Sequence, residues 1–317
     1  MKRPRKVRAF NRVQPQMTEE DQRRQQFISP SKHKLNPYLM MHFTRTEQYI
    51  AGSAIPPWGT PIVYMNGLNS TAAFGVPSIT AAAACDIYYN STSLILPMNG
   101  ANGSTTFTDS SPSPKTVTRN GNTQISTTQS KFGGASAYFD GTGDYLTIPY
   151  TTVAFDWWTT DFTLEYWVYA NDLSTFSFSN GTNVVSVAIA NAEPGAPGVN
   201  YWSFGPISTG VIRFYYFTGS QNVVSSTQTI SINTWNHVAL VKNSSGINIF
   251  VNGVGLASPV AISGTPQSSA SYPLIMGQIN NRSMNGYIDD VRITKGVARY
   301  TSNFTVPTSA NPTVVCT

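Results

Sequence analysis

Alternation of apolar and polar positions is clearest in residues 131–146. Small or aromatic apolar side chains occupy every second position of 135–139, which is the two-residue period of a half-buried strand. Asp140 and Gly141 come next, and glycine accepts a positive φ angle without a Cβ clash. The alternation then resumes at 145–148. This stretch therefore predicts two strands joined by a hairpin-type turn.

The same rhythm recurs along the rest of the chain. Further short strands are predicted at 93–97, 162–169, 184–190, 201–204, 211–217, 235–241, 247–251, 274–277 and 286–293. Asn252-Gly253 follows one of them and is a strong signal for a type I′ turn. Many short strands separated by turn residues are typical of sandwiches and jelly rolls. The predicted fold is all-β, a two-sheet antiparallel jelly-roll sandwich.

The first 88 residues follow a different pattern. Residues 18–27 suit a short helix with Thr18 as its N-cap, and prolines and aromatics alternate irregularly through 29–60. That composition predicts an extended arm that runs over another surface. The expected domains are an extended basic anchoring arm at 1–60, a linker or small subdomain at 61–88, the jelly roll at 89–310 and a tail at 311–317.

Charge is concentrated at the N-terminal end. The whole chain has a net charge of +5, but residues 1–50 hold eleven Lys/Arg and four Asp/Glu, a balance of +7, which leaves −2 for the rest. Six basic residues precede the first acid: Lys2, Arg3, Arg5, Lys6, Arg8 and Arg12. A segment this polar buries too little apolar area to order itself. It is therefore either a solvated tail or a segment held by a partner. A protein partner is the simplest candidate and nucleic acid the less favoured one.

Cysteine and targeting signals are sparse. Cys85 and Cys316 are the only cysteines, which is too few for a disulfide framework, and we expect free thiols. The basic N-terminal residues have no apolar segment after them, so no secretory signal is predicted. No apolar run is long enough to span a membrane. We therefore expect a protein made in a reducing cytoplasm.

Six segments, taken in order, resemble the concanavalin A-like, laminin-G-type jelly roll over residues 92–307. They are FGGASAYFDGTGDYL (132–146), FTLEYWVY (162–169), WNHVALV (235–241), IFVNG (249–253), GYIDDVRI (286–293) and GVARYT (296–301). The resemblance implies two antiparallel sheets of about six or seven strands each. It also implies binding of sugars or proteins, sometimes through calcium. This variant of the pattern looks like modules of tailed-phage virion proteins and bacterial surface proteins.

Catalytic residues are not predicted. Glycoside hydrolysis needs two carboxylates flanking the scissile bond, and laminarinase-type relatives place them on one strand as Glu-x-Asp-x-Glu. The predicted body has only Glu165 and Glu193, and no second acid lies two residues from Glu165. We expect Glu165 to be a surface or cross-strand residue and His237 to be a hydrogen-bonded structural residue. The sequence therefore predicts a protein that is not an enzyme.

Ligand and metal positions have two readings each. Trp157, Trp158, Tyr215 and Tyr216 are the candidates for stacking on sugar rings, and the alternative is that they belong to the core. Asp140 and Asp144 share one turn and are the candidate calcium ligands. The alternative there is that Asp140 caps the turn through its own backbone. Asp289 and Asp290 add a second acidic pair near the last strand.

The leading hypothesis is a phage virion structural protein, a capsid decoration or a head- or tail-attached protein. Its arm would bind a virion protein such as the major capsid or tail protein, and its jelly roll would present a lectin-like surface for glycan attachment. We expect a homo-oligomer located in the virion, with no membrane contact. The alternatives are a tail fibre, a free carbohydrate-binding adhesin and, as a third class, a hydrolase.

Overall fold

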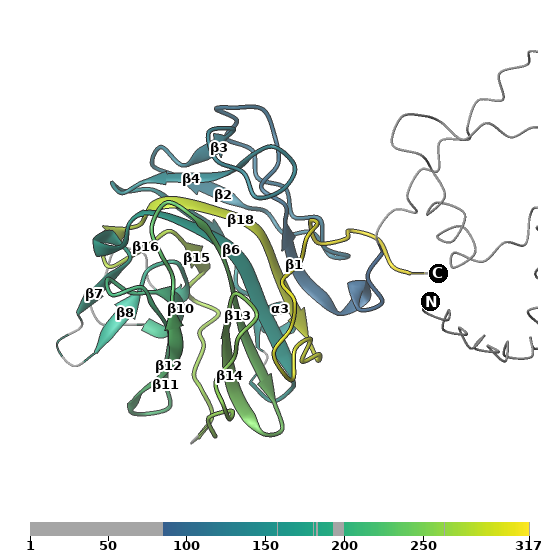
Figure 1. Cartoon of the computed structure of the whole chain (residues 1–317), viewed down its shortest axis with the longest axis vertical. Helices are drawn as coiled ribbons and strands as arrows, with labels where there is room; N and C mark the ends of the chain where they lie inside the picture. The colour runs from purple at the N-terminus through teal and green to yellow at the C-terminus, as the bar shows by residue number, and fades with distance from the viewer. Residues whose placement is uncertain are drawn as a thin grey trace, which may run out of the picture. The chain divides into compact units, whose positions relative to one another are not determined.

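Two layers of antiparallel strands make up the part of the chain that the computed structural model describes. This part is residues 85–316, apart from 157, 180, 182, 193–199 and 263. Figure 1 shows the layers curving around a shared interior, with β6, β18 and β13 in one and β10, β11 and β12 in the other. The prediction of an all-β sandwich is confirmed, and the predicted N-terminal arm lies outside the described residues.

The first sheet has seven strands in the order β14-β13-β6-β18-β4-β3, with β1 paired to the far end of β18. Its strands are β1 (Thr92–Leu96), β3 (Gln124–Ser126), β4 (Ser136–Asp140), β6 (Phe162–Asp172), β13 (Trp235–Asn243), β14 (Gly246–Val251) and β18 (Asn285–Lys295). The long central strand β18 shifts register between Asp289 and Arg292, where Asp290 adopts a φ of 51°. This bulge aims its acidic side chains at loops outside the sheet.

The second sheet also has seven strands, in the order β12-β11-β10-β9-β15-β5-β2. They are β2 (Thr118–Asn120), β5 (Tyr145–Ile148), β9 (Ile189–Ala192), β10 (Asn200–Pro206), β11 (Val211–Phe217), β12 (Gln221–Thr229) and β15 (Leu274–Met276). Two small hairpins pair β7 (Ser177–Ser179) with β8 (Val184–Ser186) and β16 (Gln278–Ile279) with β17 (Arg282–Ser283). The helical turns of the described range are η2 (Tyr89–Ser91), α3 (Thr152–Phe155) and η3 (Leu173–Thr175). No helix in this range has the length and apolar character needed to cross a membrane.

The core fills the space between the two sheets. On β6 every second side chain points inward, and Leu164, Tyr166 and Val168 are fully buried. Tyr166 crosses to the second sheet, where its hydroxyl donates to the Phe204 carbonyl oxygen over 3.2 Å and its ring packs edge-on against the Phe204 ring. The alternation read from the sequence therefore places the inner face correctly.

The predicted hairpin at 140–144 is wrong. β4 pairs with β18 and β3 in the first sheet, whereas β5 pairs with β15 and β2 in the second. The turn therefore carries the chain from one sheet to the other. Phe139 and Leu146 are both fully buried, so the two strands cover the core from opposite sides. The local turn signal was sound, but strand pairing is decided by which sheet can cover each apolar face.

A C-terminal strap, residues 296–316, covers part of the outer face of the first sheet. Its backbone is fixed by Thr163, whose hydroxyl donates to the Val297 carbonyl oxygen and accepts from the Arg299 amide. Its stacked Tyr300 and Phe304 rings pack on Phe250 of β14. A sheet face that would otherwise be wet is thereby turned into a second, smaller core.

The strap ends in a disulfide between Cys85 and Cys316, so the prediction of free thiols is wrong. The Asp86 amide donates to the Val314 carbonyl oxygen over 2.9 Å beside the disulfide. The two cysteines are 231 residues apart in sequence, and only the folded sandwich brings its first and last segments together. Residues 311–316, expected as a tail, are thus tied to the body.

Candidate functional site

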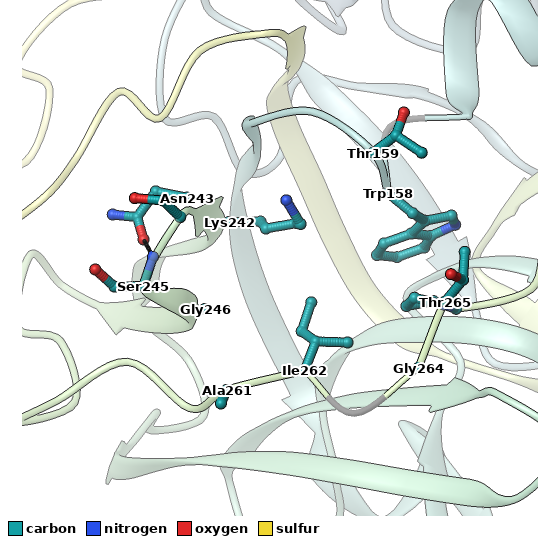
Figure 2. A pocket seen from close by; sticks show the side chains of 12 residues that line it. Trp158, Thr159, Lys242, Asn243, Ser245, Gly246, Ala261, Ile262, Gly264 and Thr265 are labelled. Atoms are coloured by element: carbon teal, nitrogen blue, oxygen red, sulfur yellow. Dashed lines mark hydrogen bonds between the residues drawn. The ribbon is translucent and has the colours of Figure 1, made fainter.

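A pocket of about 560 Å³ opens at the end of the β13–β14 hairpin. The hairpin supplies one wall, residues 261, 262 and 264–266 supply the floor, and Trp158 with Thr159 supplies the opposite wall. Figure 2 shows the Lys242 side chain reaching into this space toward the Trp158 indole, with Ile262 below them. The pocket thus gathers segments from three distant parts of the sequence.

Local backbone chemistry holds the hairpin against the floor loop. Ile247 and Val260 exchange two backbone hydrogen bonds, of 2.9 and 2.7 Å. Gly246 has a φ of 124°, and a Cβ there would run into the Val260 carbonyl oxygen. At the tip of the hairpin the Asn243 side chain accepts from the Ser245 amide over 2.8 Å. These contacts fix the pocket wall without any ligand.

The pocket lining combines an apolar wall with polar edges. Trp158 is only 5% exposed, and its indole is held by ring contacts with Phe162 at 5.4 Å and Phe214 at 5.7 Å. Lys242 Nζ donates to the Thr160 carbonyl oxygen over 3.0 Å. The remaining polar lining residues are Thr159, Asn243, Ser244, Ser245 and Thr265. An apolar surface with a few polar groups around it is typical of small-molecule sites.

Of the three proposed aromatic ligand contacts that the structure describes, Trp158 alone lines this pocket. Trp157 lies outside the described residues. Tyr215 and Tyr216 are each 3% exposed, and Tyr216 stacks on Phe214 inside the core. These two tyrosines therefore belong to the core, which was the alternative interpretation. They point to opposite faces of the second sheet, and both faces are buried at this point. Their role in ligand binding stays a prediction.

A second aromatic surface was missed by the sequence reasoning. Four rings form a row across β4, β18, β6 and β13: Tyr138, Tyr287, Tyr169 and Trp235. Neighbouring ring centroids are 4.9, 5.7 and 5.6 Å apart. The row lies on the outer face of the first sheet beside the strap, and three of its members are half-buried. The register of four strands creates it, so no single segment signals it.

Asp140 and Asp144 serve the backbone of their own corner. Both Asp144 oxygens accept from backbone amides, those of Asn122 over 2.5 Å and Asp140 over 2.8 Å. The Asp140 side chain accepts from the Thr142 amide over 2.7 Å, as the capping alternative requires. Burial raises the pKa of Asp144 despite these hydrogen bonds. In the described ranges, no three His, Cys, Asp or Glu side chains gather into a group that could hold a metal ion.

Glu165 is a cross-strand residue, as one of the two expectations had it, but it is not on the surface. It is 1% exposed and lies under the strap on the outer face of the first sheet. Its Oε1 accepts from Arg292 Nε over 2.9 Å and from Arg292 Nη2 over 2.7 Å. Its Oε2 accepts from the Tyr300 hydroxyl over 2.6 Å and contacts His237 Nε2 at 3.2 Å. The expected structural role of His237 is confirmed.

Two further charged residues, Asp86 and Arg299, extend this cluster. We call the four charged residues Asp86, Glu165, Arg292 and Arg299 the ion network. Asp86 accepts from Arg292 over 3.2 Å and from Arg299 over 2.6 Å. Burial alone would raise the pKa of Glu165, but the positive charge of Arg292 and the hydrogen bonds of His237 and Tyr300 outweigh it and hold that pKa well below its ordinary value. The network is therefore ionised and joins the first and last segments of the described range to the sheet.

Asp289 and Asp290 serve loops in the same way. Asp289 is fully buried and its Oδ2 accepts from the Lys131 and Phe132 amides, while Oδ1 has no partner. Asp290 accepts from the Asn311 amide in the strap. Burial raises the pKa of Asp289 to about 7 and that of Asp290 to about 6. Both acids therefore change charge near neutral pH.

Comparison with known proteins places this architecture in a family. A laminin-G-type family model described as "Concanavalin A-like lectin/glucanases superfamily" matches residues 140–299. The match covers half of the chain, and the protein belongs to this superfamily. The anchoring residues Lys2 to Arg12 lie outside both the match and the described residues. No curated protein matches the sequence closely enough to count as a relative.

Solved structures with a similar fold share little sequence. The binding domain of Paraclostridial Mosquitocidal Protein 1 is 15% identical with a TM-score of 0.49, and the match covers 66% of this chain and 50% of that one. The binding domain of botulinum neurotoxin serotype C1 is 17% identical, with a TM-score of 0.47 and coverages of 66% and 50%. Domain 4 of the GH43 arabinanase AbnA from Geobacillus stearothermophilus, in complex with arabinotriose, is 16% identical with a TM-score of 0.42. That match covers 65% of this chain and 92% of the domain's chain. The chain thus spans about half the length of the toxin domains.

Proposed function

We propose that the β body is a carbohydrate-binding, lectin-like module whose ligand occupies the pocket beside Trp158. The observation that carries this proposal is the pocket lining. Sugars have an apolar ring face and a rim of hydroxyl groups, and the pocket offers a rigid indole wall with hydroxyl, amide and ammonium groups around it. Membership of a superfamily that includes lectins supports the same function.

Binding of the full-length chain to a glycan array tests this function. We expect a defined set of glycans to bind, and Ser244→Trp to abolish that binding because an indole on this exposed turn fills the pocket mouth. Thr128→Trp is the matched control, since Thr128 is equally exposed on a loop of a different part of the body and does not line the pocket. A silent array, or equal loss in both variants, would contradict the proposal.

Tyr138→Ala separates the pocket from the aromatic row. Tyr138 is half-buried at one end of that row, so its removal leaves the core packed. We expect array binding to survive this change. Binding that is lost with Tyr138 and kept in Ser244→Trp would move the site to the row and overturn the assignment to the pocket.

We also propose that the module is not an enzyme. Glu165, the carboxylate that the hydrolase alternative would need, is buried and engaged on both oxygens, by Arg292 on one side and by Tyr300 and His237 on the other. A carboxylate in that state reaches no glycosidic bond. Release of reducing sugar from any glycan that binds on the array would contradict this proposal.

For the whole chain we propose a phage virion structural protein that displays this module. The support is the basic segment from Lys2 to Arg12, which is too polar to order itself, followed by a lectin-like body. Its partners are virion proteins, such as the major capsid or tail protein, and a host-surface glycan. Its location is the virion, and its assembled form is a homo-oligomer.

Deletion of residues 1–60 tests the anchoring role. We expect the shortened chain to stay soluble and to keep glycan binding, while particles assembled with it lack the protein. Incorporation is measured by quantitative mass spectrometry of purified particles. Normal incorporation of the shortened chain would overturn the anchoring proposal and leave the glycan-binding proposal standing.

A further inference from the structure

Among the described residues, Lys242 has no acidic partner. The residue is partly buried at the pocket wall, and the hydrogen bond of its ammonium group within this part of the chain is to the neutral Thr160 carbonyl oxygen. No acid of the described residues lies within ion-pair distance of it, and no Asp or Glu is among the residues that line the pocket. A lysine at a pocket wall whose ammonium group has no acidic partner in the described part of the chain is placed to bind a negatively charged group of a ligand.

The position of Lys242 also fits a ligand. Lys242 pairs with Phe162 in the β13–β6 register, and Phe162 supports the Trp158 indole. Figure 2 places the Lys242 ammonium and the Trp158 indole on either side of the same open space. A sugar bound in this space, beside the exposed edge of the indole, would therefore hold a ring substituent near the ammonium group. The hydroxyl groups of Ser244, Ser245 and Thr265 remain for its neutral hydroxyls.

We propose that the pocket selects an acidic sugar, one that carries a carboxylate, sulfate or phosphate group, and that Lys242 Nζ binds this group. The inference rests on the proposed glycan-binding function and adds the ligand class. A hydrogen bond to an ionised acceptor is stronger than one to a hydroxyl, and an ion pair inside a partly closed pocket is screened less by salt than one on the open surface.

Matched sugar pairs test the inference with the full-length chain. The pairs are 3′-sialyllactose with lactose, glucuronic acid with glucose, and glucose 6-sulfate and glucose 6-phosphate with glucose, each titrated by isothermal calorimetry. We expect at least one acidic member to bind about tenfold or more tighter than its neutral partner. That ratio should fall as the salt concentration rises.

Substitutions locate the acid group. Lys242→Met should abolish the preference, and Lys242→Arg should keep part of it because the charge remains. Lys295→Met is the matched control, because Lys295 also donates only to neutral carbonyl oxygens, those of residues 152 and 153, and lies outside the pocket lining. Far-UV circular dichroism confirms that each variant is folded.

Two outcomes separate this inference from the function beneath it. Equal affinity for acidic and neutral members, with array binding intact, would overturn the acidic-sugar inference alone. An acid preference that survives Lys242→Met would also overturn it. A silent array together with silent titrations would overturn the glycan-binding proposal itself.

Discussion

The ion network and the pocket both contain a cation withdrawn from water, and they treat it in opposite ways. Arg292 of the network is almost fully buried and is paired with two carboxylates, Glu165 and Asp86. Lys242 of the pocket is half-buried and contacts one neutral carbonyl oxygen. A buried charge that is fully paired supports structure, whereas one without a counter-charge is left available for a ligand.

This contrast separates the family motifs from the binding surface. The segments that resemble the laminin-G pattern supply Glu165, His237, Arg292 and Tyr300, and all four meet beneath the strap. The pocket lining comes largely from the hairpin turn at 243–246 and from residues 261, 262 and 264–266, which belong to no motif. These motif residues therefore hold the sandwich together, while the proposed ligand pocket is formed mainly by loops.

Replacing each cation by methionine is the sharpest test of the contrast. Arg292→Met leaves Glu165 buried without its guanidinium partner, while Asp86 keeps its ion pair with Arg299, and we expect unfolding to become easier by about 3–5 kcal/mol. Lys242→Met removes one hydrogen bond to a neutral acceptor and should cost about 1 kcal/mol or less. Urea unfolding at pH 7 measures both. Similar losses in the two variants would show that the two sites do not differ in kind.

The disulfide is expected to support only the network side of the comparison. Cys85 adjoins Asp86, and Cys316 ends the strap that covers Glu165. The double change to serine should lower the free energy of unfolding by about 2–4 kcal/mol, because the unfolded chain loses a long closed loop. A reducing agent should lower the melting temperature of the natural chain and leave that of the variant unchanged. Sugar affinity at the pocket should stay the same; a large change in it would couple the two regions.

A change of pH should lower stability in both directions, through Glu165 of the network at low pH and through Asp289 at higher pH. The pKa of Glu165 is below its ordinary value, so its contribution is present above about pH 4.5 and is lost as the pH falls. The pKa of Asp289 is raised to about 7, so its contribution is fully present below about pH 3.8 and is lost as the pH rises through 7. These two groups together therefore predict maximum stability near pH 4, between about pH 3.8 and 4.5, in thermal unfolding scans.

Asp289→Asn isolates the alkaline side. An asparagine oxygen can still accept from the Lys131 and Phe132 amides, and the side chain no longer ionises. The decline between pH 5 and 8, on the order of 1–3 kcal/mol in the natural chain, should become shallower in the variant. An unchanged slope would mean that Asp289 does not titrate in this range.

The smallest expected effect is at the corner between the sheets. Asp140→Ala removes the acceptor for the Thr142 amide on an exposed turn and should cost about 1 kcal/mol. The capping role predicts the same cost with and without calcium. A rise in melting temperature on adding calcium, lost in Asp140→Ala, would establish the calcium alternative instead.

The residues that the sequence identified well are those with a local signal. Alternation located β6 and β13 almost to the residue, and Asn252 and Gly253 adopt the positive φ angles that the predicted type I′ turn requires. The sequence missed Lys242 as a site residue, because nothing near it in the chain marks an ammonium group without a partner. It also missed the aromatic row, whose members come from four strands.

By itself the sequence determined most of the long strands and their inward faces, because backbone geometry ties side-chain direction to a period of two. It missed β12 and the short strands β2, β3, β7, β16 and β17, and it indicated the family through the resemblance of six ordered segments. The tertiary structure alone decided which strands pair across the corner at 140–144, that Cys85 meets Cys316, and that Glu165 is buried by a strap 135 residues away in the chain. The physical reason is the distance along the chain over which each kind of interaction acts. Local rules act over a few residues, whereas pairing, burial and charge compensation are settled only when the whole sandwich closes on its core.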